Sequence, residues 1–199
     1  MKKEKDAYSK SLNARFLFCP KCACTSVRKD FGFKWTPFNL IPEDSLSFFT
    51  VRNPYDRMSS QFKEIILKDS NAAPTIDTKV YNRVIRSIRN TKDPSRQVSM
   101  FFESIDKYGL FDSHLVSQTY AMTNPEYNRD TINVDKVHLI DFDNMEEELN
   151  NIFSTDVTLT VHNKGKDFDT SLINQYREYI KNLYKEDIEL YNHIKARIK

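Results

Sequence analysis

The sequence lacks a glycine-rich loop, a long apolar run and a strong excess of either charge. Its 199 residues include only three glycines, and the glycine spacing of an ordinary phosphate-binding P-loop is absent. No stretch approaches the roughly twenty apolar residues of a membrane span, and no apolar segment follows the polar start at residues 1–6. These absences predict a soluble, unsecreted chain without a membrane partner, which we expect in the cytoplasm.

Cysteine is also scarce. The three cysteines all lie between positions 19 and 24, which argues against a disulfide framework and indicates a reducing compartment. Cys19 and Cys22 form a Cys-x-x-Cys pair, which is typical of redox or zinc sites, but no second pair of ligands follows at a zinc-site spacing. We therefore expect no metal.

The charges nearly balance, with 30 Lys and Arg against 28 Asp and Glu and a formal net charge of +2. This balance does not provide the broad basic surface of a nonspecific nucleic-acid binder, so we expect no nucleic-acid partner. The positive excess is concentrated in the first thirty-odd residues, which fits an acidic small molecule better than a polyanion. We interpret Arg83, Arg86 and Arg89 as a solvated helix face.

Three β-to-α steps are expected along the chain. Aromatic and β-branched runs predict strands, each followed by a helix with apolar residues at helical spacing. The expected pairs cover residues 16–19 and 23–31, 46–52 and 54–67, and 135–142 and 145–153, with further helices at 80–89, 95–108 and from 173 onward. This order favours an α/β fold with three layers: a mainly parallel central sheet flanked by helices, with a P-loop-like phosphate-binding loop. We expect a polar tail at 1–14 and a single domain at 15–199.

A first candidate anion site follows the strand expected at 16–19. Pro20 ends that strand, Lys21 adds a positive charge, and Thr25 and Ser26 are hydroxyl residues near a helix N-terminus. Backbone N–H groups at such a terminus lack intrahelical partners and favour an anion. An ordinary strand–turn–helix corner remains the alternative.

A second candidate follows the strand expected at 46–52. Arg52 ends that strand, and Arg57 and Ser60 lie on the first turns of the next helix, which Asn53 and Pro54 introduce. A guanidinium and a hydroxyl can hold a phosphate from two directions. Ligands of parallel sheets bind outside the carboxyl ends of the strands, and both candidate sites lie at such strand ends.

Two motifs resemble those of the sulfotransferases that use 3′-phosphoadenosine 5′-phosphosulfate (PAPS), particularly the family-2 carbohydrate sulfotransferases. Residues 20–26 are similar to that family's 5′-phosphosulfate loop, usually a Pro-Lys pair, small residues and then Thr with Ser or Asn. Residues 51–60 are similar to its 3′-phosphate motif, with an Arg and a Ser eight residues apart. Weaker support comes from 111–118, 137–145 and 184–191, and the resemblance spans about residues 15–193.

The resemblance implies a transfer of the sulfuryl group from PAPS to an acceptor hydroxyl, with PAP as the product and no metal required. Its cofactor-binding residues in this chain would be Lys21, Cys22, Ala23, Cys24, Thr25 and Ser26 for the 5′-phosphosulfate, and Arg52 and Ser60 for the 3′-phosphate. Lys21 is also expected to neutralise charge that develops during transfer, as in phosphoryl transfer. The acceptor would be a small molecule or an oligosaccharide, and the sequence names neither it nor the oligomeric state.

The catalytic base is expected to be His114. It lies in a polar segment dense in groups that handle protons, and a histidine is suited to proton transfer near neutrality. His162 and Glu64 are rival candidates, and His138 is a weaker one because it falls in an expected strand.

Two other functions are compatible with the sequence. The first is a nucleotide or small-molecule kinase on a related scaffold, for which Asp141 could be proposed as a magnesium ligand. The second is a nonenzymatic PAP- or nucleotide-binding module that keeps the phosphate cradle but lacks a working base.

Overall fold

A computed structural model describes residues 5–68, 74–123, 134–160 and 167–197. The chain divides into two compact units, which we describe separately. Unit 1 comprises residues 1–53, 117–163 and 186–199, and unit 2 comprises residues 54–116 and 164–185. The expectation of a single domain at 15–199 stays a prediction, because compactness does not decide whether the units fold independently.

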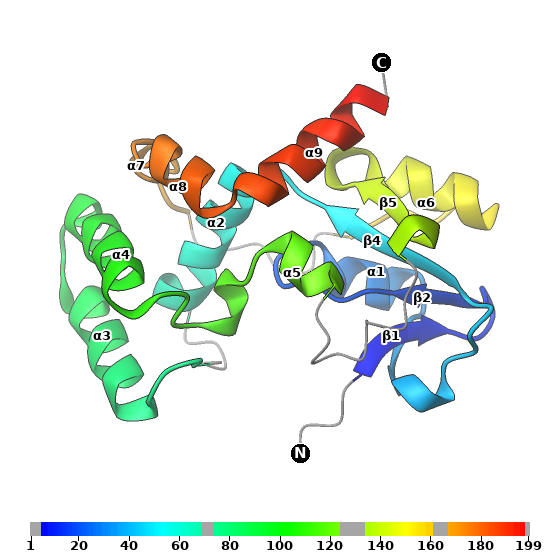
Figure 1. The fold of residues 1–199 in the computed structure, drawn as a ribbon, viewed down its shortest axis with the longest axis horizontal. Coiled ribbons are helices and arrows are strands. Elements are labelled where there is room, and N and C mark those ends of the chain that lie inside the picture. The colour runs from blue at the N-terminus through cyan, green and yellow to red at the C-terminus, as the bar shows by residue number, and fades with distance from the viewer. Residues whose placement is uncertain (1–4, 69–73, 124–133, 161–166, 198–199) are drawn as a thin grey trace. The chain divides into compact units, whose positions relative to one another are not determined.

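Unit 1 contains, within its described residues, a five-stranded mixed sheet in the order β3-β1-β2-β4-β5 (Figure 1). The strands are β1 (Lys5–Ser9), β2 (Ala14–Phe16), β3 (Lys34–Pro37), β4 (Leu46–Val51) and β5 (His138–Asp141). β2, β4 and β5 are parallel neighbours, whereas β1 is antiparallel to both β2 and β3. The α/β class with flanking helices is confirmed. The sheet is mixed rather than purely parallel, because β1, which was not expected, is antiparallel to both of its neighbours.

The N-terminal residues correct the expectation of a polar tail. β1 forms a hairpin with β2, and the turn between them includes Asn13 at a φ of 44°. Asp6 is fully buried: its Oδ2 accepts a hydrogen bond from Arg15 Nε at 2.9 Å and lies 2.9 Å from Nη2 of the same guanidinium in an ion pair. This buried ion pair, which no local pattern reveals, allows a polar segment to occupy the sheet.

The strand before the candidate loop is displaced from its expected position. β2 ends at Phe16 rather than Cys19, although the amide of Leu17 still donates to the carbonyl of Phe48 at 2.9 Å. The segment expected to be irregular at 33–44 contains β3, which lies at the sheet edge. Pro37 is tolerated there because an edge strand need not donate on both sides.

Helices α1 (Cys24–Asp30) and α6 (Met145–Phe153) pack against the sheet of unit 1. Their buried side chains form one cluster with strand residues of the same sheet face, and the cluster includes Val27, Leu149, Phe16, Phe48 and Ile140. Phe16 and Phe48 stack with ring centroids 5.1 Å apart. Unit 1 also contains α5 (Gln118–Thr123), α9 (Lys185–Arg197) from Glu186 on, and 3-10 turns at Phe38–Leu40, Val134–Lys136 and Phe142–Asn144.

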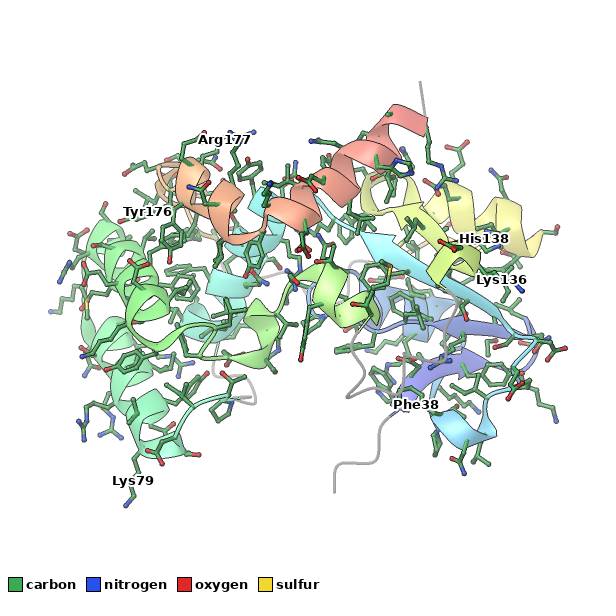
Figure 2. All side chains as sticks on the ribbon, in the orientation of Figure 1. Phe38, Lys79, Lys136, His138, Tyr176 and Arg177 are labelled. Carbon is green, nitrogen blue, oxygen red and sulfur yellow. The ribbon has the colours of Figure 1, made fainter. Side chains whose placement is uncertain are left out.

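Unit 2 is helical in its described part. It contains α2 (Pro54–Phe62), a π-helical turn (Lys63–Leu67), α3 (Thr78–Asn90), α4 (Pro94–Tyr108), a 3-10 turn (Ser113–Leu115), α7 (Ser171–Asn174) and α8 (Arg177–Leu183). Its core combines isoleucines with aromatic residues. Phe102 stacks on Tyr176, which Figure 2 labels, with 4.1 Å between the ring centroids. Among the helices that the structure describes, none combines the length and apolar character needed to cross a bilayer.

Candidate anion-binding site

The loop between β2 and α1 has a tightly constrained backbone. Lys21 and Ala23 have φ values of 66° and 58°, which residues other than glycine rarely adopt, and each costs on the order of 1–3 kcal/mol. Hydrogen bonds hold this conformation: the Thr50 hydroxyl donates to the Cys22 carbonyl at 2.6 Å, and the Cys24 thiol donates to the Cys19 carbonyl at 2.6 Å. Strain of this kind is found where a loop must present its backbone to a ligand.

The cysteines behave as small structural residues of this loop. Cys19, Cys22 and Cys24 are free thiols, and the first two are buried. Burial and the neighbouring Cys19 raise the pKa of the Cys24 thiol to about 12. A thiol that stays protonated is a weak nucleophile and a weak metal ligand, so Cys24 is poorly suited to redox chemistry in this conformation.

Arg52 lies against the loop. It directly follows β4, and its guanidinium Nη1 donates to the Lys21 carbonyl at 3.0 Å. The same guanidinium lies over the ring of Phe142, 4.5 Å from the centroid, just beyond the end of β5. Three adjacent parallel strands thus bring together, at their carboxyl ends, the loop and the arginine that the sequence predicts as anion-binding residues.

Gln118 joins Arg52 to the loop. Its side-chain Nε2 donates to the Arg52 carbonyl at 2.9 Å, while Oε1 accepts from the Arg52 amide at 2.8 Å and from the Cys22 thiol at 3.2 Å. Gln118 is fully buried, and the buried carboxylate of Asp187 accepts its backbone amide at 2.8 Å. Gln118 and Asp187 lie in segments 111–118 and 184–191, which support the resemblance, but the sequence assigned neither residue a role because each lies more than sixty residues from Arg52.

The two hydroxyl residues of the loop are not equivalent. Thr25 and Ser26 are both half-buried in the first turn of α1. The Ser26 hydroxyl donates to the carbonyl of Thr160 at 2.7 Å, so in this conformation its proton is not offered to an anion. Ser26 is therefore a weaker candidate phosphate donor than its position in the motif suggests.

Asp141, the magnesium ligand of the kinase alternative, is already engaged. Its buried carboxylate accepts from Lys195 Nζ at 2.5 Å and from Asn144 Nδ2 at 3.0 Å. The hydrogen bonds that Lys195 donates to Asp141 and Asp143 raise the pKa of Lys195 above its usual range, so its ammonium stays charged at neutral pH. Across the described ranges, no group of three or more His, Cys, Asp or Glu is placed to hold a metal ion.

On α2 in unit 2, Ser60 and Arg57 differ in burial and in their contacts. Ser60 is half-buried, whereas Arg57 is buried, donates to the carbonyl of Val116 and lies 5.8 Å from the Tyr184 ring centroid. Arg57 is thus a core residue of unit 2. Because the units are described separately, the pairing of Ser60 with Arg52 stays a prediction.

His114, also in unit 2, is held by a carboxylate. Its Nδ1 lies 2.6 Å from Asp112 Oδ1, and Asp112 Oδ2 accepts the Tyr81 hydroxyl at 2.6 Å. Burial alone would raise the pKa of Asp112, but the hydrogen bonds from His114 and Tyr81 outweigh burial and hold that pKa below its usual value. In a neutral His114 ring, an ionised Asp112 favours the tautomer with the proton on Nδ1 and the lone pair on Nε2, which is the arrangement of a general base.

The rival candidates for the catalytic base are His138, Glu64 and His162. His138, which Figure 2 labels, is exposed at the beginning of β5. Because β5 is parallel to β4, Arg52 lies at the opposite end of these strands. The carboxylate of Glu64 pairs with Lys68 Nζ at 3.1 Å. His162 lies outside the described residues.

Comparisons with family models, curated proteins and solved structures each found no match for this chain. The function is therefore argued from the chemistry of the site and its two motifs.

Proposed function

We propose that this chain is a PAPS-dependent sulfotransferase that transfers a sulfuryl group to a hydroxyl of an acceptor, which we take to be a carbohydrate. One observation carries the proposal: the Arg52 guanidinium is hydrogen-bonded to the Lys21 carbonyl at the carboxyl ends of adjacent parallel strands. Two sequence motifs that resemble separate phosphate sites of one family are thereby supported as parts of one anion-binding region.

Each residue has a role that its chemistry allows. The loop amides and Lys21 would hold the 5′-phosphosulfate, with Thr25 as a hydroxyl donor and Cys22, Ala23, Cys24 and Ser26 shaping the loop. The Arg52 guanidinium donates to the Lys21 carbonyl, and a planar guanidinium of this kind is suited to bind a 3′-phosphate. Ser60 would complete that phosphate site, as the resemblance implies.

The chemical step requires neutralisation of charge and removal of one proton. Lys21 would stabilise the negative charge that develops between the sulfuryl group and the leaving phosphate. In this mode of catalysis the protein positions the reactants and neutralises charge, and forms no covalent bond to them. His114, oriented by Asp112, would accept the proton of the attacking hydroxyl. The kinase alternative is less favoured because the Asp141 carboxylate is committed to Lys195.

Thermal unfolding with different nucleotides tests the proposal. We expect PAP to stabilise the protein far more than adenosine 5′-phosphate or Mg²⁺-ATP, because only PAP carries a 3′-phosphate for Arg52. At about 100 times its Kd, a ligand stabilises the folded state by about 2.7 kcal/mol, which raises the Tm of a chain of this size by about 5–10 °C. A larger shift with Mg²⁺-ATP than with PAP would support the kinase and contradict the sulfotransferase.

A further inference from the structure

One face of α3 in unit 2 carries cations that the proposed donor site does not use. Lys79, Arg83 and Arg86 follow one another at intervals of four and three residues, so they lie in one row along the helix. The row borders a hollow of about 520 Å³, and Figure 2 shows Lys79 at the beginning of the helix with its side chain extended away from it. The residues lining the hollow are Lys79, Asn82, Arg83, Arg86, Ser87 and Asn90, all exposed.

No described residue neutralises these three cations. In the described part of the chain, none of their side chains makes a hydrogen bond or an ion pair. Asp77, which precedes the row, uses its carboxylate to accept the backbone amides of Lys79 and Val80 at 3.0 and 3.1 Å. Like charges four residues apart destabilise a helix, and an anionic ligand would relieve that repulsion.

Arg89, on the same helix, differs from these three cations because its guanidinium is hydrogen-bonded within unit 2. The expectation that Arg89 belongs to a solvated helix face is therefore wrong. Its guanidinium donates to the carbonyls of Ile65, Ile66 and Lys68 at 2.9, 2.9 and 2.6 Å. These carbonyls lie at the end of the π-helical turn Lys63–Leu67 or just after it. Arg89 is therefore a structural cap for those carbonyls. Among the basic residues of α3, Arg89 thus has carbonyl partners, whereas Lys79, Arg83 and Arg86 form the row that borders the hollow.

The composition of the hollow indicates the class of ligand. None of its lining residues is aromatic, so it offers no platform on which nucleobases could stack. It also lacks the apolar and aromatic anchors that are typical of protein interfaces. Two asparagines and a serine instead alternate with the cations, and these side chains hydrogen-bond well to hydroxyl groups.

We propose that this face of α3 binds an acidic carbohydrate chain bearing sulfate or carboxylate groups. Helical rise separates Lys79 from Arg83 by about 6 Å and Arg83 from Arg86 by about 4.5 Å along the axis, a row that suits successive anionic groups of a linear chain. The neighbouring amides and hydroxyl bind the sugar hydroxyls. This interaction is independent of the proposed sulfuryl transfer, since it needs neither PAPS nor Lys21.

Binding of the full-length protein to a fluorescent heparin oligosaccharide tests the proposal. The triple variant Lys79→Gln, Arg83→Gln, Arg86→Gln is compared with Lys10→Gln, Lys34→Gln, Lys136→Gln, which removes the same charge from exposed positions of unit 1. We expect the α3 variant to lose about tenfold or more in affinity and to show a weaker salt dependence, while the control stays close to the parent.

Uncharged dextran and a single-stranded DNA oligonucleotide of equal charge serve as further probes. We expect no binding to dextran and weaker binding to DNA than to heparin. The proposal is overturned if the parent does not bind heparin, if the two triple variants lose equal affinity, or if DNA binds as tightly as heparin. Because these are binding measurements without nucleotide, their failure would leave the thermal response to PAP unchanged.

Discussion

Replacing Lys21 by methionine is expected to lower kcat for sulfuryl transfer by about 10²–10³-fold, and to weaken PAP binding by about tenfold or less. The ammonium interacts most strongly with charge that exists only in the transition state, so the loss falls mainly on turnover. Methionine keeps the length of the side chain and, like lysine, has a Cβ, so the substitution adds no strain at the φ of 66°. The rate is measured with labelled PAPS on a panel of sugar acceptors.

Lys29→Met is the matched control for this variant. Lys29 is exposed in the last turn of α1, the helix that follows the loop of Lys21, and its replacement removes the same charge. We expect this control to retain the activity of the parent. A Lys21 variant that loses PAP affinity and keeps its turnover would show that Lys21 binds the nucleotide without assisting the transfer.

Replacing His114 by alanine is expected to lower kcat by about 10²–10⁴-fold and to leave PAP affinity unchanged, because a general base acts on the acceptor hydroxyl rather than on the nucleotide. Added imidazole should restore part of the activity, which a purely structural histidine would not permit. Asp112→Asn should reduce kcat by a smaller factor, since it disturbs the proton position on Nδ1 but keeps the ring.

His138→Gln is the control for the His114 variant, because His138 is exposed at the beginning of β5. It should transfer sulfate at the parental rate. Near-parental turnover of His114→Ala would exclude His114 as the base. Loss of activity without imidazole rescue would instead indicate that His114 maintains the turn at Ser113–Leu115, which Asp112 caps through the His114 amide at 2.9 Å.

Local sequence patterns predicted a strand well where consecutive residues of that strand are buried. β4 contains an unbroken run of buried residues from Phe48 to Val51, followed closely by Pro54 at the start of a helix, and its bounds were predicted to within one residue. β1 was missed because Asp6 looks like a solvated residue and is buried only through its pairing with Arg15. Only the tertiary structure provides that partner.

The same distinction applies to the candidate site. The loop at Lys21 and Arg52 were predicted because each follows an apolar run, and parallel strands bring such positions together. Gln118 and Asp187 were missed because their contribution depends on contacts across distant parts of the sequence. Arg57 also shows that an arginine in a phosphate-like motif can be a core residue.

The central claim is that Lys21 and Arg52 belong to one site for a 3′,5′-bisphosphorylated adenosine, and calorimetric titration of PAP into the parent and Arg52→Gln tests it most directly. Arg28→Gln is the control, since Arg28 lies at the other end of α1 and faces Trp35. Circular dichroism should show that both variants fold. We predict that Arg52→Gln weakens PAP binding by about 2–5 kcal/mol, about thirtyfold or more, while Arg28→Gln binds as the parent does. Equal PAP affinity of Arg52→Gln and the parent, or no PAP binding by the parent, would contradict the claim.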